Sequence, residues 1–176
     1  MFQNPDQLDA SAEFTQTICS KLSTDRGVHA ETAISAASRM AGTLLLRSTG
    51  LPVTRFEPGA PVFIEAIEEQ GERLLGTVGQ TLASLQVPFD PSKLDFDTPQ
   101  ANSPHLGLRE TQSILDPSFR AILAKYRLNE EQGAQAAAVS AAVLIHNCAG
   151  FLDPHVSYTI AAYGIIEGCK TVPFVS

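Results

Sequence analysis

The chain has the length and composition of one ordinary globular domain. It contains 176 residues, of which 44% are hydrophobic and 18% charged, and its formal net charge is −7. The negative charge argues against nucleic acid as a partner, because phosphate binding requires clustered lysines and arginines, and the twelve basic residues here are scattered. For the same reason we find no basic amphipathic helix suited to a membrane surface.

Cysteine usage and the opening residues indicate the compartment. The three cysteines, Cys19, Cys148 and Cys169, are too few and odd in number for a disulfide framework. The opening residues, MFQNPDQLDASAEF, have no positively charged region followed by an apolar core, so we expect no secretory signal. We expect free thiols in the cytoplasm, and the overall pattern suggests a small bacterial protein.

The first two helices are marked by their ends. Asn4 followed by Pro5 predicts a helix start, because asparagine caps a helix and proline suits its first position. This helix is expected to extend over residues 5–22. A second helix is expected over residues 28–48, with Gly50 as its C-terminal stop.

The third helix is predicted from its periodicity. Over residues 61–85, three- and four-residue spacing relates Ile67, Gly71, Leu74, Val78, Leu82 and Leu85. Gly71 on this apolar side predicts the close approach of another helix, since glycine weakens a helix and needs a packing reason. Four prolines then predict a long loop over residues 87–105.

A further proline divides the next helical stretch. Residues 108–115 are expected to form a short helix. Asp116 followed by Pro117 repeats the signal seen at Asn4, which predicts that a separate helix begins there. We expect this helix to end near Leu128.

The last two helices have strong start signals. Asn129, with Gln132 three positions later, predicts a capping box at the start of a helix over residues 130–149. The Asp-Pro pair at 153–154 predicts the start of the last helix, over residues 154–170.

Hydrophobic patterning predicts an all-α fold. No segment alternates polar and apolar residues for long enough to indicate a sheet. Three helices, over 28–48, 130–149 and 154–170, carry almost no charge, and such helices are expected to be central and buried on all sides. Polar side chains interrupt the second of them and the third is too short to span a bilayer, so we expect no membrane insertion. We predict a single-domain bundle of about six helices over residues 1–176, with a Pro-rich loop at 87–105.

Small residues four positions apart recur in these central helices. Ser38 and Gly42 are one such pair, and Ala134 and Ala138 are another. The spacing lets helix axes approach closely. Because one small domain has difficulty covering three such helices, we also expect a homodimer, the commonest oligomer.

The stretch from His146 to His155 contains the first candidate site. Cys148 with either histidine offers a nucleophile and a base for catalysis, and Asp153 offers a group to orient the base. On one helix, however, His146 and Cys148 point roughly 200° apart, so they share a site only if the helix ends between them. The simpler interpretation is that one helix ends near Gly150 and another begins, with Cys148 as an apolar filler.

A metal site is the second candidate. Its ligands would come from His29, Glu31, His146 and His155. None of the spacings typical of zinc or di-iron sites is present, and the motifs that bind nucleotides are also absent. We therefore expect no cofactor, and the alternative interpretation is that each histidine is a satisfied boundary residue.

Arg39 and Glu167 form the third candidate, a buried charge pair. Each interrupts an otherwise uncharged helix, and a buried charge must be paired because its desolvation is costly. We expect the two side chains to contact each other, or a polar cluster with Tyr158, Tyr163 or Ser35. The alternative is that each reaches solvent along its own helix.

These observations leave two classes of function. The first is a non-catalytic helical protein that acts through self-association, or by binding a protein partner or a small apolar ligand. The second is a metal-dependent or cysteine/histidine-based enzyme with its site near the 146–155 helix–helix turn and the 87–105 loop as its lid. The absence of a catalytic motif favours the first class.

Overall fold

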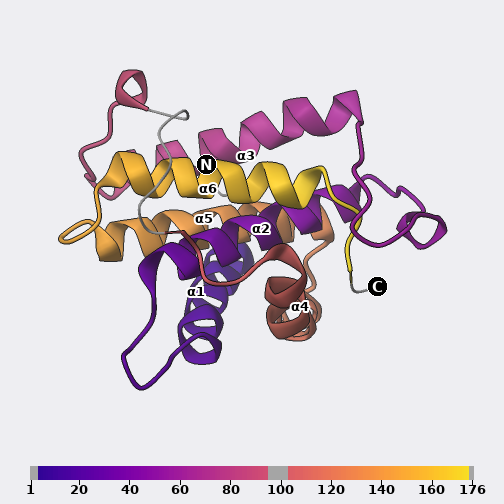
Figure 1. The fold of residues 1–176 in the computed structure, drawn as a ribbon, viewed down its shortest axis with the longest axis horizontal. Helices are drawn as coiled ribbons and strands as arrows, with labels where there is room; N and C mark the ends of the chain where they lie inside the picture. Colours follow the sequence, from indigo (N-terminus) through magenta and orange to yellow (C-terminus); the bar gives the residue numbers. More distant parts are fainter. Residues whose placement is uncertain (1–3, 95–102, 175–176) are drawn as a thin grey trace.

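The all-α prediction is confirmed in the described part of the chain. The computed structural model describes residues 4–94 and 103–174. Over these residues the chain is 71% helical, with six α-helices and no strands. In chain order (Figure 1) they are α1 (Pro5–Lys21), α2 (Ala30–Ser48), α3 (Glu65–Ser84), α4 (Leu108–Lys125), α5 (Glu130–Cys148) and α6 (Pro154–Cys169).

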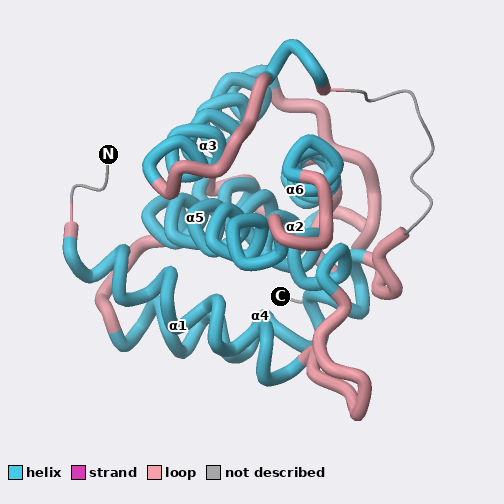
Figure 2. Tube along the Cα trace, turned by 90° about the vertical axis from the view of Figure 1, so that its left-hand side faces the viewer, coloured by secondary structure: helices cyan, strands magenta, loops and turns pink. Residues whose placement is uncertain are grey.

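The helices form three layers, with α2 and α5 in the middle. In Figure 2, α3 and α6 lie above this central pair, and α1 and α4 lie below it. α2 packs mainly against α5 and α6, while α5 also packs against α1 and α3. Between α1 and α4, the rings of Phe14 and Phe119 stack with their centroids 4.0 Å apart. The central layer is therefore covered on both faces.

The two central helices are buried nearly all round. In α2, every residue from Ala30 to Leu46 is buried except Arg39. In α5, the side chains from Gly133 to Ile145 are buried with few exceptions, and most of them are alanines. Burial of apolar surface contributes about 25 cal/mol per Å². The expectation of all-round burial therefore holds for both helices.

The last helix, α6, differs from that expectation. It buries one side against α2, but Val156, Tyr163 and Ile166 on the other side are 39%, 50% and 44% exposed. The lack of charge in α6 had suggested burial on every side. At the edge of the upper layer, however, α6 has neighbours on only part of its circumference. In α6, the absence of charged residues therefore predicts burial less reliably than the small residues that pack against α2.

Glycines bring the backbones of α2 and α6 into direct contact. A Cβ atom added to Gly42 would lie 2.8 Å from the Cys169 nitrogen, and one added to Gly164 would lie 2.8 Å from the Ser38 Cβ atom. A Cβ atom on Gly168 would lie 2.8 Å from the Thr43 nitrogen. Because positions 38 and 42 face 164 and 168 in the same order, the two helices run in parallel.

The expected role of Gly71 is not observed. The nearest atom to an added Cβ there is the Cys169 Sγ, at 3.9 Å, which is an ordinary contact. The close helix approach lies instead between α2 and α6, where Gly42 meets Gly168 and Gly164 meets Ser38. Apolar periodicity placed Gly71 on the packed side of α3, but it contains no information on how near the facing helix comes.

Three of the predicted helix starts are confirmed by their caps. The Asn4 side chain accepts a hydrogen bond from the Asp6 N–H, and Asp153 accepts one from the His155 N–H. Asn129 forms both hydrogen bonds of a capping box. Each cap satisfies N–H groups that have no partner inside the helix.

The helix start predicted at Asp116 and Pro117 is wrong, because α4 runs through both residues. Proline removes one helical hydrogen bond at this point. Leu115 and Phe119, one turn apart, are fully buried on the same face, and this packing holds the two segments together. Asp116 does not cap a helix, since its carboxylate accepts hydrogen bonds from two arginines, one of which is Arg120.

The third helix begins at Glu65 rather than at Pro61. Pro61 forms an isolated antiparallel bridge with Thr171, and the Val62 N–H donates to the Lys170 carbonyl oxygen at 2.8 Å. The chain after α6 therefore holds these residues in an extended conformation, which prevents them from joining α3.

The proline-rich loop expected over 87–105 is described only at its two ends, because residues 95–102 lie outside the described residues. At one end the Asp90 N–H donates to His155 Nε2 at 3.1 Å. At the other end the His105 N–H donates to Thr32 Oγ1 at 2.9 Å. The described ends are thus anchored near the first turns of α6 and α2.

The glycine contact can be tested with Gly168→Ala. The added methyl group would collide with the α2 backbone and should destabilise the protein by about 3 kcal/mol, at the upper end for overpacked interiors. Gly76→Ala in α3 is the matched control, because an added Cβ there has no neighbour within 4 Å. It should be neutral or stabilise by about 0.5–1 kcal/mol. Equal urea midpoints for the two variants would contradict a close contact.

Candidate functional site

A hollow of about 820 Å³ lies at the N-terminal end of α2. It is lined by residues 21–32, which comprise the end of α1, the following turn and the first turn of α2. The remaining walls are His105, Leu106, Ile114 and Phe151. We call this cavity the His29 hollow.

A chain of hydrogen bonds runs along one wall of the His29 hollow. His29 Nε2 lies 3.2 Å from Glu31 Oε2, and His29 Nδ1 lies 2.8 Å from Thr32 Oγ1. The Thr32 oxygen also accepts the His105 N–H. With a neutral imidazole, every contact is satisfied if the Thr32 hydroxyl donates to Nδ1 and the Nε2–H donates to Glu31. Both ring nitrogens of His29 are therefore engaged.

His105 adds a second imidazole to this wall. The His29 and His105 rings stack with centroids 3.8 Å apart and planes 14° from parallel. His105 could not be predicted from the sequence, because its neighbours in the chain give no pattern and its partner, the N-cap of α2, is distant along the chain. The stack and the hydrogen bond to Thr32 together hold the segment before α4 against the start of α2.

The four predicted metal ligands do not converge. His29 and Glu31 lie side by side, but they form an ion pair or hydrogen bond with each other instead of facing a common metal position. His146 is exposed on α5, and His155 is hydrogen-bonded to Asp153 and to the Asp90 N–H. Within the described residues, no group of three or more His, Cys, Asp or Glu side chains is arranged to hold a metal ion.

The predicted catalytic residues are brought together only in part, because His155 Nδ1 lies 3.0 Å from Asp153 Oδ1 as the hypothesis requires, but Cys148 does not join them. α5 continues through Cys148, so His146 and Cys148 remain on one helix and point in different directions. No described hydrogen bond joins the Cys148 thiol to a histidine. Burial, followed by the charges of Cys19 and Glu31, raises the pKa of Cys148, which disfavours the reactive thiolate.

His155 serves as a structural link at the start of α6. Its Nε2 accepts the Asp90 N–H, so the ring proton lies on Nδ1, which is 3.0 Å from Asp153 Oδ1. The His155 ring also packs against Phe89. Hydrogen bonds from the backbone N–H of His155 lower the pKa of the Asp153 carboxyl. These contacts connect the loop before residue 94 to the α6 cap.

The order carboxylate, imidazole, hydroxyl in Glu31, His29 and Thr32 is the order of a hydrolase triad. The Thr32 side chain, however, is nearly completely buried, and its oxygen already accepts the His105 N–H. His29 is the N-cap residue of α2, so the three residues are neighbours in one helical turn. The chain of hydrogen bonds therefore acts to fix the His105 segment.

Arg39 and Glu167 lie in contact across the α2–α6 interface. Arg39 Nε donates to Glu167 Oε2 at 2.6 Å, and Arg39 also donates to the Leu106 carbonyl oxygen. The Arg39 side chain is 12% exposed and that of Glu167 is 41% exposed. The pair thus lies at the boundary of the core, where it connects α2, α6 and the segment lining the His29 hollow.

A second ion cluster was missed by the sequence analysis. Arg47 on α2 pairs with Asp116 on α4, and their side chains are only 6% and 5% exposed. Arg120 pairs with the other oxygen of Asp116 at 2.9 Å. Burial raises the pKa of the neighbouring Glu130 carboxyl, which the charges of Arg47 and Arg120 partly oppose. The available signal was Asp116 itself, an acid on the apolar face of α4.

Comparison with known proteins finds no matching family model, no similar curated protein and no similar solved structure. Among the helices of the described residues, none is long and apolar enough to cross a bilayer.

The raised thiol pKa values predict slow alkylation. Burial raises the pKa of Cys169 to about 12 and raises those of Cys19 and Cys148 as well. At pH 8 the native protein should react with iodoacetamide more slowly than the urea-unfolded chain, by roughly a thousandfold at Cys169. The rate should increase with pH as the thiolates form. Peptide mass spectrometry measures each site, and faster alkylation of native Cys148 would support the enzyme alternative.

The contact between Arg39 and Glu167 predicts energetic coupling. In a cycle of Arg39→Met, Glu167→Gln and the double variant, the double change should be less damaging than the sum of the single changes by about 1 kcal/mol. The exposed pair Glu69 and Arg73 on α3 is the control, and its coupling should be below about 0.5 kcal/mol. Additive urea-unfolding energies for the α2–α6 pair would contradict the interaction.

Proposed function

We propose that this protein is a non-catalytic helical protein that binds a small, largely apolar ligand in the His29 hollow. The observation that carries the proposal is a cavity of about 820 Å³ with an apolar wall of Leu22, Val28, Ile114 and Phe151. Small-molecule sites typically have volumes of about 300–1,000 Å³ and combine apolar walls with a few polar groups.

Exposure of apolar side chains at this cavity supports the proposal. Phe151 is 76% exposed and Val28 is 37% exposed. Large apolar side chains in water at the edge of a hollow are typical of binding surfaces. A ligand between these two residues would remove their surfaces from water and gain the free energy of that burial.

Binding is favoured over catalysis because the imidazole of His29 and its two polar neighbours in the wall are already occupied. Glu31, His29 and Thr32 form hydrogen bonds with one another or with the His105 backbone. A catalytic base needs a nitrogen directed at the substrate, and the described contacts of His29 leave it none.

Self-association stays a prediction, and its original reason now applies to α6 alone, where Val156, Tyr163 and Ile166 remain exposed. α2 and α5 are covered within a single chain, so a second copy is not needed to bury them. We keep a protein partner and a cytoplasmic location as expectations, the latter supported by three cysteines without disulfides.

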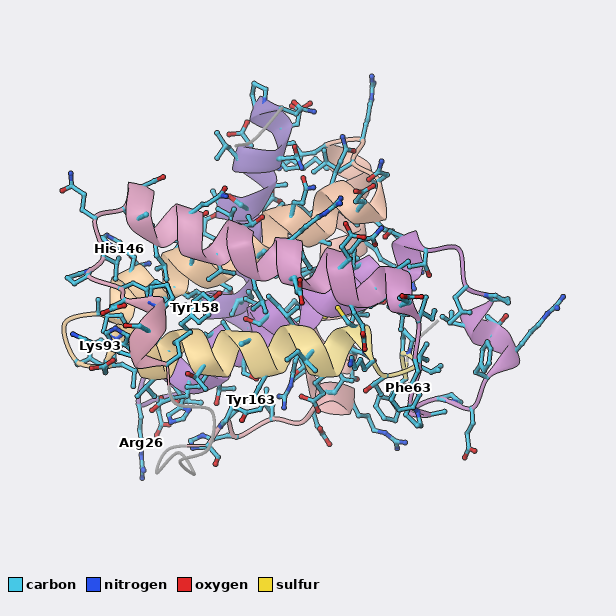
Figure 3. The ribbon with its side chains drawn as sticks, turned by 90° about the horizontal axis from the view of Figure 1, so that it is seen from above. Arg26, Phe63, Lys93, His146, Tyr158 and Tyr163 are labelled. Carbon is cyan, nitrogen blue, oxygen red and sulfur yellow. The ribbon has the colours of Figure 1, made fainter. Side chains whose placement is uncertain are left out.

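The proposal predicts that the neutral fluorescent probe N-phenyl-naphthylamine binds at one saturable site. Phe151→Ser should weaken this binding about five- to tenfold, because it removes an aromatic contact at the mouth of the hollow. Phe63→Ser is the matched control, since Phe63 is 81% exposed and lies toward the end of the molecule opposite Arg26 (Figure 3). Fluorescence titration gives the affinities, and circular dichroism checks that each variant is folded.

Two results would reject the proposal. One is the absence of saturable binding to the unmodified protein. The other is an equal loss of affinity in the Phe63 and Phe151 variants, which would place the probe on apolar surface in general.

A further inference from the structure

We propose that a groove between α1 and α3 is a second ligand site, which takes a neutral, polyhydroxylated molecule with one apolar face. The groove has a volume of about 580 Å³. Residues of α5 form its floor, with α1 on one side and α3 on the other (Figure 2). We call it the α1–α3 groove. It shares no lining residue with the His29 hollow, so this inference goes beyond the proposed function and does not depend on it.

The lining of the α1–α3 groove contains no charged residue. Of its ten lining residues, four are aliphatic, four carry a hydroxyl group and two are glutamines. An ion in this groove would lose water without gaining a counter-charge, which is unfavourable. Three other hollows on the described surface each include charged side chains. The α1–α3 groove therefore favours a neutral ligand.

The hydroxyl groups of the groove are arranged as hydrogen-bond acceptors. Each donates its single proton to a backbone carbonyl oxygen three or four residues earlier in its own helix, at 2.8 to 3.1 Å. Three of the four, Thr77, Thr81 and Ser84, lie on successive turns of α3 and form one wall. A hydroxyl oxygen whose proton is already used still has lone pairs. The α3 wall therefore presents a row of acceptors to a ligand.

A glutamine of α5 supplies a donor opposite this wall. The buried Gln7 Nε2 donates to the Gln132 carbonyl oxygen at 3.2 Å and to Gln135 Oε1 at 3.0 Å. Because a backbone carbonyl oxygen can only accept, the first contact sets the orientation of the Gln7 amide, and Gln7 in turn sets that of Gln135. Gln135 lines the groove, and its Nε2 has no hydrogen-bond partner among the described residues. This donor is therefore available to a ligand.

Aliphatic side chains supply the apolar surface of the groove. Val139 and Val143, one turn apart on α5, lie at the floor, and Leu8 on α1 is 49% exposed. A ligand that covered these side chains would gain the free energy of apolar burial. A purely apolar ligand, however, would also cover the α3 hydroxyls and leave their oxygens without water or another donor, which is costly. A sugar ring attached to an alkyl chain combines the hydroxyl donors and the apolar face that the groove requires.

Two probes with the same alkyl chain separate hydrogen bonding from apolar contact. Octyl glucoside has several hydroxyl donors, whereas its fully O-methylated analogue has none, and both are neutral. The double variant Thr77→Val with Thr81→Val should bind octyl glucoside about three- to tenfold more weakly, because it removes two acceptors. It should bind the methylated analogue equally well or more tightly, since the new methyl groups enlarge the apolar wall. Titrations followed by NMR, below the micelle concentration of each probe, give the affinities.

Matched controls make the same chemical change elsewhere. Thr17 and Thr54 do not line the groove, so the double variant Thr17→Val with Thr54→Val should bind both probes as the unmodified protein does. Phe151→Ser, which alters the His29 hollow, should also retain the affinity for octyl glucoside. Circular dichroism checks that each variant is folded.

Each outcome supports or overturns the inference. Selective loss of octyl glucoside affinity in the Thr77 and Thr81 variant supports it. The inference is overturned if octyl glucoside shows no saturable binding to the unmodified protein, or if its affinity is equal in the groove variant and the control variant. Weaker binding in the Phe151 variant would place the glucoside in the His29 hollow and also overturn it. The proposed function is decided separately, by the binding of N-phenyl-naphthylamine.

Discussion

The backbone contact between α2 and α6 determines where the surrounding elements lie. With glycine at 42, 164 and 168, the helices approach to a separation that no Cβ atom would permit. Close packing over several turns gains many dispersion contacts and excludes water from the backbone. It also constrains the register of the two helices, because Gly42, Gly164 and Gly168 each face atoms of the neighbouring helix that leave no room for a Cβ atom. The first turns of α2 and α6 consequently lie at the same end of the molecule.

The near-complete burial of α2 has a consequence for its polar side chains. A charge in the core needs a partner, because desolvation without one costs several kcal/mol. Arg47 pairs with Asp116 of α4, Arg39 pairs with Glu167 of α6, and Glu31 pairs with His29. Two of these partners lie on other helices, whereas His29 is the N-cap of α2 itself. The polar residues of α2 thus specify where its neighbours dock, whereas its apolar residues supply most of the stability.

The sequence predicts features that depend on neighbouring residues well, and contacts between segments far apart in the chain poorly. Caps such as that at Asn129 depend on residues a few positions apart, so their signals lie within one stretch of sequence. The interpretation of Pro117 failed because packing of α4 against the core outweighed a local signal. The positions of Gly71 and His105 depend on contacts between distant segments, and no spacing rule encodes them. The pairing of Arg39 with Glu167 was deduced because each is an isolated charge in an apolar helix.

The same physical logic explains why a cavity lies at the start of α2. This end of the helix is covered by turns rather than by another helix, and turns fill space less completely than packed helices do. The polar network of Glu31, His29 and Thr32 holds the His105 segment in place on one side of the opening. The network uses its own hydrogen-bonding capacity for this purpose, so the apolar wall is the part of the hollow on which the proposed ligand binding depends. A rigid helix terminus beside an apolar wall is the arrangement that the proposed binding of an apolar ligand requires, because apolar surface contributes most of the affinity at such sites.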